Sequence, residues 1–387
     1  MTDPTAGQRD VNRGRVLAAV TRGANSRAGI VADTGLARST VAGLVQELLA
    51  EGRLTEDAAP AGQRLPGRPP KVLRVAGGRS VVVAVDLGHS HCRVGVVAVE
   101  DGAAVVLGEG TARLDVDASP DEAVDQAVRI AKRLLRATRQ AADAGGVGLP
   151  APVDVRTGSV GTGNLLPRWV DRRPAAELSA RLGVPFAADN DANLGALAEV
   201  TFGGARGVDD LVYVKAATGI GAGLLLGGRL HHGVGGRAGE IGHVPVDPGG
   251  PVCRCGNRGC LETVASTVQV LSAVRSHEAA PATMADVAGL VTAGDPGASR
   301  VVTDAGRMIG RVLADLVNNL SPRQIVVGGE LAAATEPLLA GVRESIDRYA
   351  QPGLARGIAV TPSSLGVSAE LLGAAALAMR LGHAAPS

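Results

Sequence analysis

Apolar and polar residues near the start of the chain alternate with helical periodicity, which predicts a helix-turn-helix. Three helices are predicted, over residues 13–20, 26–33 and 37–51. The second and third are separated by Thr34-Gly35-Leu36, and a tight turn containing Gly between a short and a longer helix is typical of this motif. Short strands at Arg53-Leu54 and 72–75 bracket a loop rich in Pro and Gly. Residues 1–78 are therefore predicted to form a winged helix-turn-helix domain.

From residue 80 the pattern becomes that of an α/β protein. Buried strands are predicted at 81–87, 92–100 and up to about 113, followed by a helix to about 142 and a strand entering a loop over 145–154. Ser119 is the expected N-cap of that helix, with Pro120 at its first position and Glu122 closing a capping box.

A similar order of elements returns later in the chain. Residues 211–230 are predicted as strand, glycine turn and strand, with helices near 263–276 and 299–319 and a strand over 324–330. In each half the first hairpin has a turn that could face a phosphate. This pattern predicts an internally duplicated fold, with halves at 79–200 and 201–387.

Composition and charge narrow the function. Apolar residues make up 45% of the 387, which is enough for a buried interior. Aromatic residues make up only 1%, which argues against binding single-stranded nucleic acid by base stacking. Residues 1–78 hold eleven Arg or Lys against seven Asp or Glu, so the N-terminal end is the candidate nucleic-acid end. No apolar run is long enough to cross a bilayer, and the polar N-terminus lacks a signal peptide. We therefore expect a cytoplasmic protein with reduced cysteines and no membrane partner.

Four residues have the spacing of a metal site. His243, Cys253, Cys255 and Cys260 form H-x9-C-x-C-x4-C, and structural zinc prefers four nitrogen and sulfur ligands. Glycines between the cysteines allow the tight turns that three converging thiolates need. The alternative is three unrelated buried cysteines. Cys92, on a predicted strand, is expected in the core.

Three segments together resemble the ROK family (repressors, open reading frames, kinases). They are residues 229–243 (RLHHGVGGRAGEIGH), residues 253–262 (CRCGNRGCLE) and the N-terminal helix-turn-helix. The resemblance is strongest to the transcriptional regulators of the family and covers residues 13 to 380. It implies an actin-like, ribonuclease H-like sugar-kinase fold after the winged helix, and it assigns the same four ligands to a structural zinc.

The resemblance also implies a sugar site. Its residues would be Asn164, Asn190, Asp191, Glu240, His243 and Glu262. Paired carboxylates and amides suit a polyol, because they hydrogen-bond to neighbouring hydroxyls. His243 would bind zinc through one ring nitrogen and use the other toward a second partner or the sugar. The alternative for Asp191 and Glu240 is that they are solvated loop carboxylates.

Phosphoryl transfer would need more than the sugar site. In a kinase of this family Asp191 would be the general base, and ATP with Mg²⁺ would lie on two glycine-rich turns. The remnants of those turns here are Asp86, Gly88, Ser90, Thr218, Gly219 and Gly221. In the first turn His89 replaces the second glycine of the family's D-x-G-G-T, and a side chain there would obstruct the approach of a phosphate. This change argues against efficient use of ATP and Mg²⁺, and both turns could persist only as tight hairpins.

The candidate DNA contacts lie in two places. Arg38, Ser39 and Thr40 begin the second helix of the motif, the part that faces base edges in the major groove. Arg64, Arg68 and Lys71 surround the predicted wing, where an Arg on a Pro-stiffened loop suits a narrow minor groove. The alternative is a helical hairpin used for protein contacts. Two-fold symmetric readers are usual, so a homodimer or homotetramer on an inverted-repeat operator in double-stranded DNA is expected.

Three hypotheses follow for the whole chain. The first is a regulator, most simply a repressor, of carbohydrate-metabolism genes that a sugar or sugar derivative releases or modulates. The second is an ATP-dependent hexose kinase, similar to a glucokinase, with an appended DNA-binding domain. The third is a regulator with a vestigial pocket that answers to a protein partner.

Overall fold

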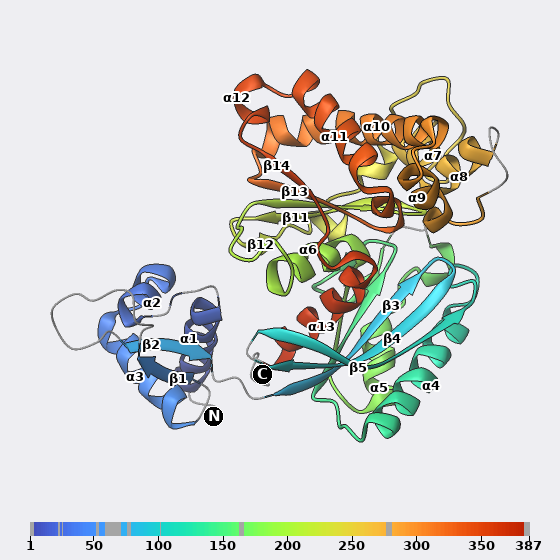
Figure 1. Cartoon of the computed structure of the whole chain (residues 1–387). Coiled ribbons are helices and arrows are strands. Elements are labelled where there is room, and N and C mark those ends of the chain that lie inside the picture. Colours follow the sequence, from blue (N-terminus) through green and yellow to red (C-terminus); the bar gives the residue numbers. More distant parts are fainter. Residues whose placement is uncertain are drawn as a thin grey trace. The chain divides into compact units, whose positions relative to one another are not determined.

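The computed structural model describes residues 4–21, 24, 26–51, 54–58, 71–75, 79–100, 102–161, 166–275 and 281–382. The chain divides into two compact units, one built mainly from residues up to Ser80 and one from most of the remainder (Figure 1). Each unit is described by itself below.

The described residues of the N-terminal unit form three helices and a two-stranded antiparallel sheet. Its elements are α1 (Pro4–Thr21), α2 (Arg27–Thr34), α3 (Arg38–Ala50), β1 (Leu54–Ala58) and β2 (Lys71–Val75). One apolar core joins them, with Leu17, Ile30, Val45 and Leu73 all buried. This order of elements agrees with the predicted winged helix, and α1 begins earlier than the helix predicted at 13–20.

The turn between α2 and α3 has a clear local cause. Ser26 caps α2 by accepting a hydrogen bond from the Gly29 N–H at 3.1 Å. Gly35 ends α2 in the left-handed region at φ 67°, a conformation that glycine adopts without steric cost. The chain then enters α3 at Arg38, so two helices joined by a glycine turn lie where the helix-turn-helix was predicted.

The second unit contains two five-stranded sheets with equivalent strand order. The first is β5 (Ala103–Arg113), β4 (His91–Glu100), β3 (Ser80–Gly88), β6 (Ala144–Leu149) and β9 (Phe186–Asn190). The second is β12 (Arg229–Leu230), β11 (Ile220–Leu226), β10 (Leu211–Ala216), β13 (Gln324–Gly328) and β14 (Ala359–Pro362). In both sheets the last two strands run parallel to the central one. The equivalent order confirms the predicted duplication.

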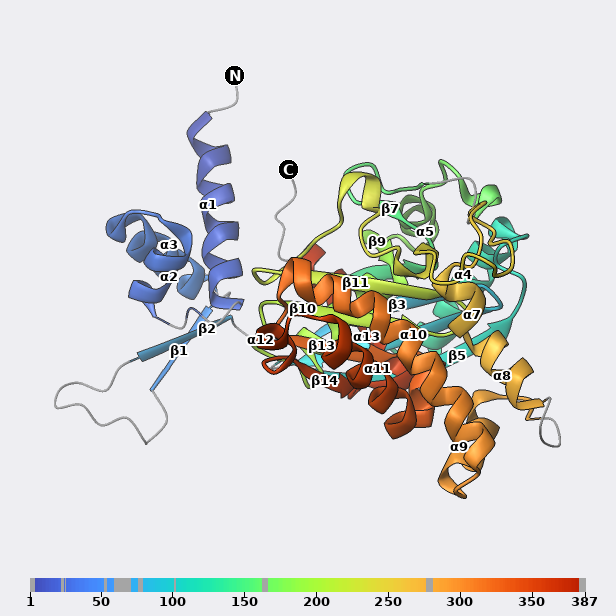
Figure 2. The same ribbon diagram turned by 90° about the horizontal axis from the view of Figure 1, so that it is seen from above.

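Helices cover both sheets (Figures 1 and 2). Helices α4 (Pro120–Thr138) and α5 (Pro174–Leu182) share an apolar core with the first sheet. On the second sheet, the principal covering helices are α10 (Pro296–Leu320) and α11 (Thr335–Tyr349). The smaller elements of this unit are α7 (Leu261–Ala265), α8 (Thr267–Arg275), α9 (Met284–Thr292), α12 (Pro352–Ala355), β7 (Val153–Asp154), β8 (Ser159–Val160) and the 3-10 helices η1 (Pro167–Trp169), η2 (Val234–Gly236), η3 (Ile241–His243), η4 (Glu330–Ala334) and η5 (Gly366–Ser368).

Two further helices join the halves. Helix α6 (Asp191–Thr201) follows β9 and packs against β10 and β11 of the second sheet. The final helix, α13 (Ala369–Gly382), contacts both α6 and the first sheet: a side chain at Gly373 would collide with the Leu194 carbonyl, and one at Gly146 with the Ala374 carbonyl. Glycines at these contacts permit close backbone packing.

Two local predictions were wrong. Helix α4 does begin at Pro120, but the Ser119 side chain makes no capping hydrogen bond, so the predicted capping box is absent from this described segment. The ψ of Ser119 is 66°, outside the extended region typical of a capping residue. The helix also ends at Thr138 and not near 142, because Arg139 takes a left-handed conformation at φ 54°. Helices α5, α6, α9, α11, α12 and α13 were not predicted.

Among the described residues, no helix combines the length and the hydropathy needed to span a bilayer.

Candidate functional site

A pocket of about 280 Å³ is lined by elements of both halves of the second unit. The end of β3, the β10–β11 turn, the start of α6, η3 and α7 all contribute to its wall. Its volume is close to the lower end of the range of about 300–1,000 Å³ typical of small-ligand sites. The predicted residues Asp86, Gly88, Ser90, Asn190, Asp191, Thr218, Gly219, Gly221, Glu240, His243 and Glu262 all line it.

Asn190 and Asp191 lie where β9 passes into α6. The Asn190 side chain caps the helix by accepting hydrogen bonds from the N–H groups of Ala192 at 2.9 Å and Asn193 at 3.2 Å. Asp191 is buried, and its Oδ1 accepts from the Ala192 N–H at 2.8 Å. The fixed backbone of a helix start therefore orients both side chains.

Asp191 is paired with a lysine. The Nζ of Lys215, on β10, lies 2.7 Å from Asp191 Oδ2, and the two side chains are 16% and 9% exposed. Burial lowers the pKa of Lys215, but the negative charges of Asp191, Glu370 and Asp86 outweigh it and raise the pKa above its usual value. The lysine is therefore a fixed cation.

Glu240 and Glu262 complete a group of carboxylates with Asp191. Burial raises the pKa of Glu240 to about 7, and the charges of Asp191 and Glu262 add to the shift. Glu262 accepts a hydrogen bond from the Ile220 N–H at 3.3 Å and faces the Arg254 guanidinium at 3.4 Å. Carboxylates grouped in this way can accept hydrogen bonds from the hydroxyls of a polyol.

The first glycine turn carries a histidine that reaches the second turn. His89 Nδ1 lies 2.8 Å from Asp117 Oδ1. A Cβ placed on Gly219 would lie 3.7 Å from His89 Nε2, so the imidazole lies beside the second turn. In the same hairpin, His91 Nε2 lies 3.2 Å from the buried carboxylate of Asp86. An imidazole thus occupies space between the two turns.

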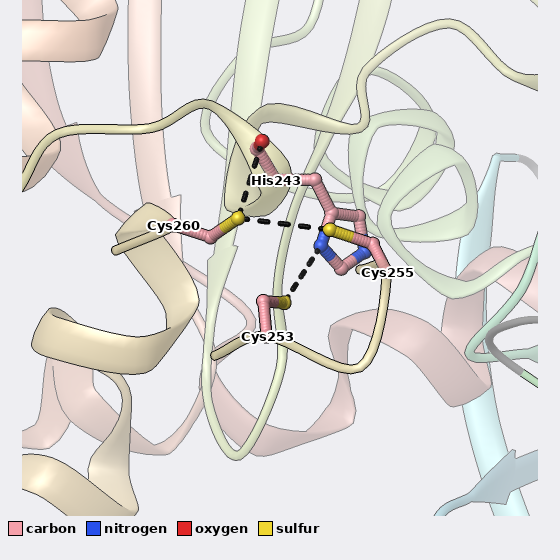
Figure 3. A group of neighbouring side chains, drawn as sticks. All are labelled: His243, Cys253, Cys255 and Cys260. Carbon is pink, nitrogen blue, oxygen red and sulfur yellow. Dashed lines mark hydrogen bonds between the residues drawn. The ribbon is translucent and has the colours of Figure 1, made fainter. Parts of the chain in front are cut away.

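The four predicted metal ligands meet at one point (Figure 3). The ligand atoms of His243, Cys253, Cys255 and Cys260 all lie within 4.8 Å of one another. Cys253 Sγ is 3.5 Å from His243 Nδ1, and Cys255 Sγ is 3.7 Å from Cys260 Sγ. A tetrahedron with bonds of about 2.3 Å to sulfur has edges of about 3.8 Å, so the cluster fits a four-coordinate metal ion.

Backbone geometry brings these ligands together. Gly256, at φ 95°, and Gly259, at φ 61°, adopt left-handed conformations between the cysteines. A side chain at Gly259 would collide with the Asp247 carbonyl. Cys92 lies elsewhere, buried on β4 as predicted.

Several predicted residues are placed away from the pocket or outside the described residues. Asn164 lies outside them, as do Arg64 and Arg68. Lys71 is the first residue of β2. At the start of α3, Arg38 and Ser39 are exposed and Thr40 is half-buried.

The sequence interpretation missed several side chains that line the pocket, and three of them are charged groups close to the predicted carboxylates. Lys215 pairs with Asp191, Arg254 faces Glu262, and Glu370 is buried near Lys215. Lys215 had a visible signal, because a lysine interrupts the otherwise apolar strand LVYVKA. Arg254 stands between two metal-ligand cysteines and Glu370 lies far along the chain, so neither had a local pattern.

The duplicated sheets, the two glycine turns and the carboxylates between them define an actin-like, sugar-kinase-like protein. The model of the ROK family matches residues 82–380, and the chain belongs to that family.

Relatives include both enzymes and regulators. The chain is 34% identical over 263 residues to a glucokinase of Halalkalibacterium halodurans, covering 62% of this chain and 78% of that protein. It is 29% identical over 351 residues to a xylose repressor of Bacillus subtilis, covering 90% and 89%. A solved ROK family transcriptional regulator, described as a homolog of the E. coli MLC protein, superposes with a TM-score of 0.77 at 25% identity and covers 97% of each chain. The two regulators are thus matched over nearly the whole chain.

Proposed function

We propose that this chain is a DNA-binding transcriptional repressor of carbohydrate-metabolism genes that responds to a sugar. The observation that carries the proposal is the extent of similarity. The xylose repressor is matched over 90% of the chain and the solved regulator over 97%, whereas the glucokinase is matched over 62%. The similarity to regulators therefore extends into the N-terminal unit.

The winged helix would bind double-stranded DNA in the cytoplasm. Arg38 and Ser39 are exposed at the N-terminus of α3, where a recognition helix meets base edges, and Thr40 follows them. Lys71, with Arg64 and Arg68 in the segment before it, would contact the minor groove or phosphates. A homodimer or homotetramer would place two such helices on an inverted repeat.

The metal ion would be zinc in a structural role. Three thiolates and one imidazole are a donor set that zinc prefers, and all four positions are supplied by the chain. Zinc would fix the segment from His243 to Cys260 and supply no chemistry to the ligand. Glu240 and Glu262, which border this segment, would then be held in place to bind a sugar together with Asn190, Asp191, His243 and Asn164.

Sugar would regulate DNA binding through a difference in affinity. A ligand changes the population of DNA-competent protein only if it binds the competent and incompetent states unequally. The test is the affinity for the DNA upstream of the chain's own gene, measured with and without D-xylose, D-glucose and their derivatives. If no sugar or derivative changes that affinity, sensing by the pocket is disproved and a protein partner becomes the better candidate effector.

Kinase activity is a second candidate function. The glucokinase relative and the retained Asp191 and Thr218-Gly219 favour it. Against it, His89 lies between the turns that would hold ATP and Mg²⁺. A coupled assay for ADP release over a panel of hexoses would decide between them, with Asp191→Asn as the control. Turnover that depends on Asp191 would replace the repressor proposal with a bifunctional enzyme.

A further inference from the structure

Lys215 is an unusual residue in this chain. The sequence has 39 Lys and Arg, yet lysine occurs at only three positions: Lys71, Lys132 and Lys215. Lys215 lies on β10 between the buried residues Val214 and Ala216, and its side chain lines the pocket. A lysine carries a compact charge on a flexible stem, which an arginine cannot replace at a tight contact. A specific interaction therefore accounts for this lysine better than composition does.

Three carboxylates surround the positive charge. Asp191 forms the ion pair at 2.7 Å, and the charges of Glu370 and Asp86 also act on Lys215. Asp86 is 4% exposed, and within the described residues its Oδ1 has no hydrogen-bond partner. Buried carboxylates without compensating charge are costly. Asp86 Oδ2 also lies 3.2 Å from His91 Nε2, and the Lys215 ammonium is the cation that pairs directly with Asp191 in this acidic part of the pocket.

We propose that Lys215 is the specificity-determining residue that makes this pocket bind a sugar without phosphorylating it. The inference rests on the proposed function of sugar sensing. Phosphoryl transfer would require Asp191 to accept the proton of a sugar hydroxyl as the new O–P bond forms and ADP leaves. Here Asp191 Oδ2 holds the ammonium and Oδ1 holds the Ala192 N–H. A proton on Oδ2 would break the direct ion pair of the buried ammonium.

The same arrangement suits binding. Asp191 is held as a hydrogen-bond acceptor in one orientation, so little conformational freedom is lost when a sugar hydroxyl donates to it. The ammonium has three N–H donors, and the ion pair with Asp191 uses one of them. Because Lys215 lines the pocket, we assign to it a direct hydrogen bond to a sugar oxygen.

The first test is calorimetric titration of the full-length, zinc-loaded protein with D-xylose and with D-glucose. Lys215→Met keeps the length of the side chain and removes its charge, and Lys132→Met is the matched control because Lys132 is exposed on α4. We expect Lys215→Met to weaken sugar binding at least tenfold and Lys132→Met to leave it unchanged. Unaltered affinity in folded Lys215→Met, or sugar-dependent ADP release by the unmodified chain, would overturn the proposal.

A second measurement needs no variant that might fail to fold. With three lysines, ¹⁵N-lysine labelling gives three side-chain ammonium signals, which Lys→Arg changes at residues 71 and 132 assign. Saturation with the bound sugar should shift the Lys215 signal and leave that of Lys132 in place. If the sugar binds and the Lys215 signal does not move, the assignment of Lys215 is wrong while sugar sensing stands. If neither sugar nor its derivatives bind the unmodified chain, the sensing proposal fails and this one with it.

Discussion

The imidazole of His243 stands between the metal-ligand cluster and the pocket, with Glu240 on its far side. Its Nδ1 lies 3.5 Å from Cys253 Sγ, and its Nε2 lies 3.6 Å from Glu240 Oε2. Nδ1 is therefore the nitrogen placed to bind a metal ion. Nε2 faces Glu240, which is a candidate sugar-binding residue. A metal-bound histidine whose second nitrogen contacts a carboxylate has its ring orientation fixed. A metal ion held by this cluster would thus be coupled to the pocket through one side chain.

Loss of the metal should therefore weaken sugar binding. We expect the double variant Cys253→Ser, Cys255→Ser to lose its zinc and at least tenfold in sugar affinity, since Glu240 and Glu262 lose their support. Metal content by mass spectrometry and affinity by calorimetry are the measurements. Cys92→Ala, a cysteine of the β4 core, is the control and should retain one zinc per chain. Full sugar affinity in the metal-free variant would show that the two sites are independent.

Gly239 should be essential for the placement of Glu240. It has a φ of 89°, and a Cβ there would collide with the Ala222 carbonyl. We expect Gly239→Ala to lower sugar affinity at least tenfold. Gly207→Ala is the matched control, because Gly207 has a φ of 78° but open space around its Cα; we expect it to cost about 1 kcal/mol of stability and no affinity. Equal sugar affinity in the two variants would contradict this role of Gly239.

Arg38 should carry part of the DNA specificity. Loss of a bidentate contact to a guanine costs about 1–3 kcal/mol, so Arg38→Ala should weaken operator binding about 10- to 100-fold. Fluorescence anisotropy with a duplex selected from random sequences is the measurement. Arg129→Ala, an exposed arginine of α4, should leave the affinity unchanged. If both variants bind equally well, α3 does not contact the bases through Arg38.

Stability should depend on pH through Glu370. Burial raises the pKa of Glu370 to about 7, an effect that Lys215 opposes and that Asp86 and Asp191 reinforce. Between pH 4.5, the usual pKa of a glutamate, and about pH 7, Glu370 keeps a proton in the folded chain that it releases in the unfolded chain. The contribution of the Glu370 carboxyl group to the free energy of unfolding is thus complete below pH 4.5 and is lost as the pH rises to 7.

Replacing the carboxyl group by an amide should remove that loss. We expect Glu370→Gln to gain about 1–3 kcal/mol of unfolding free energy at pH 8, and almost nothing at pH 4.5. Urea unfolding at both values measures it. Glu122→Gln, an exposed glutamate of α4, should show no difference between the two pH values. A gain at pH 4.5 as large as at pH 8 would mean that ionisation of Glu370 is not the cause.

Sequence patterns predicted the elements with strong local signals. The strand around Val83 and the helix-turn-helix around Gly35 follow from apolar periodicity and from a residue that tolerates positive φ. Helix α9 also had a signal that the interpretation passed over: Thr283 and Asp286 form a capping box in the structure. Ser119 shows the opposite case. Its sequence pattern is that of a capping box, but its backbone angles exclude the capping hydrogen bond.

The relationships that define the pocket could not be predicted in this way. Lys215 and Asp191 lie on different elements, and only the packing of α6 on β10 brings them together. The approach of His89 to Gly219 likewise depends on how the two halves of the unit meet. Such contacts depend on tertiary packing, and the local sequence around each residue does not predict them.

The packing of α13 on the first sheet determines when the first half of this unit can complete its folding during synthesis. Gly146 on β6 packs against the backbone at Ala374, so one face of the first sheet is only partly covered until residues 369–382 have emerged from the ribosome. During translation the first half of this unit therefore exposes apolar surface that a molecular chaperone could bind.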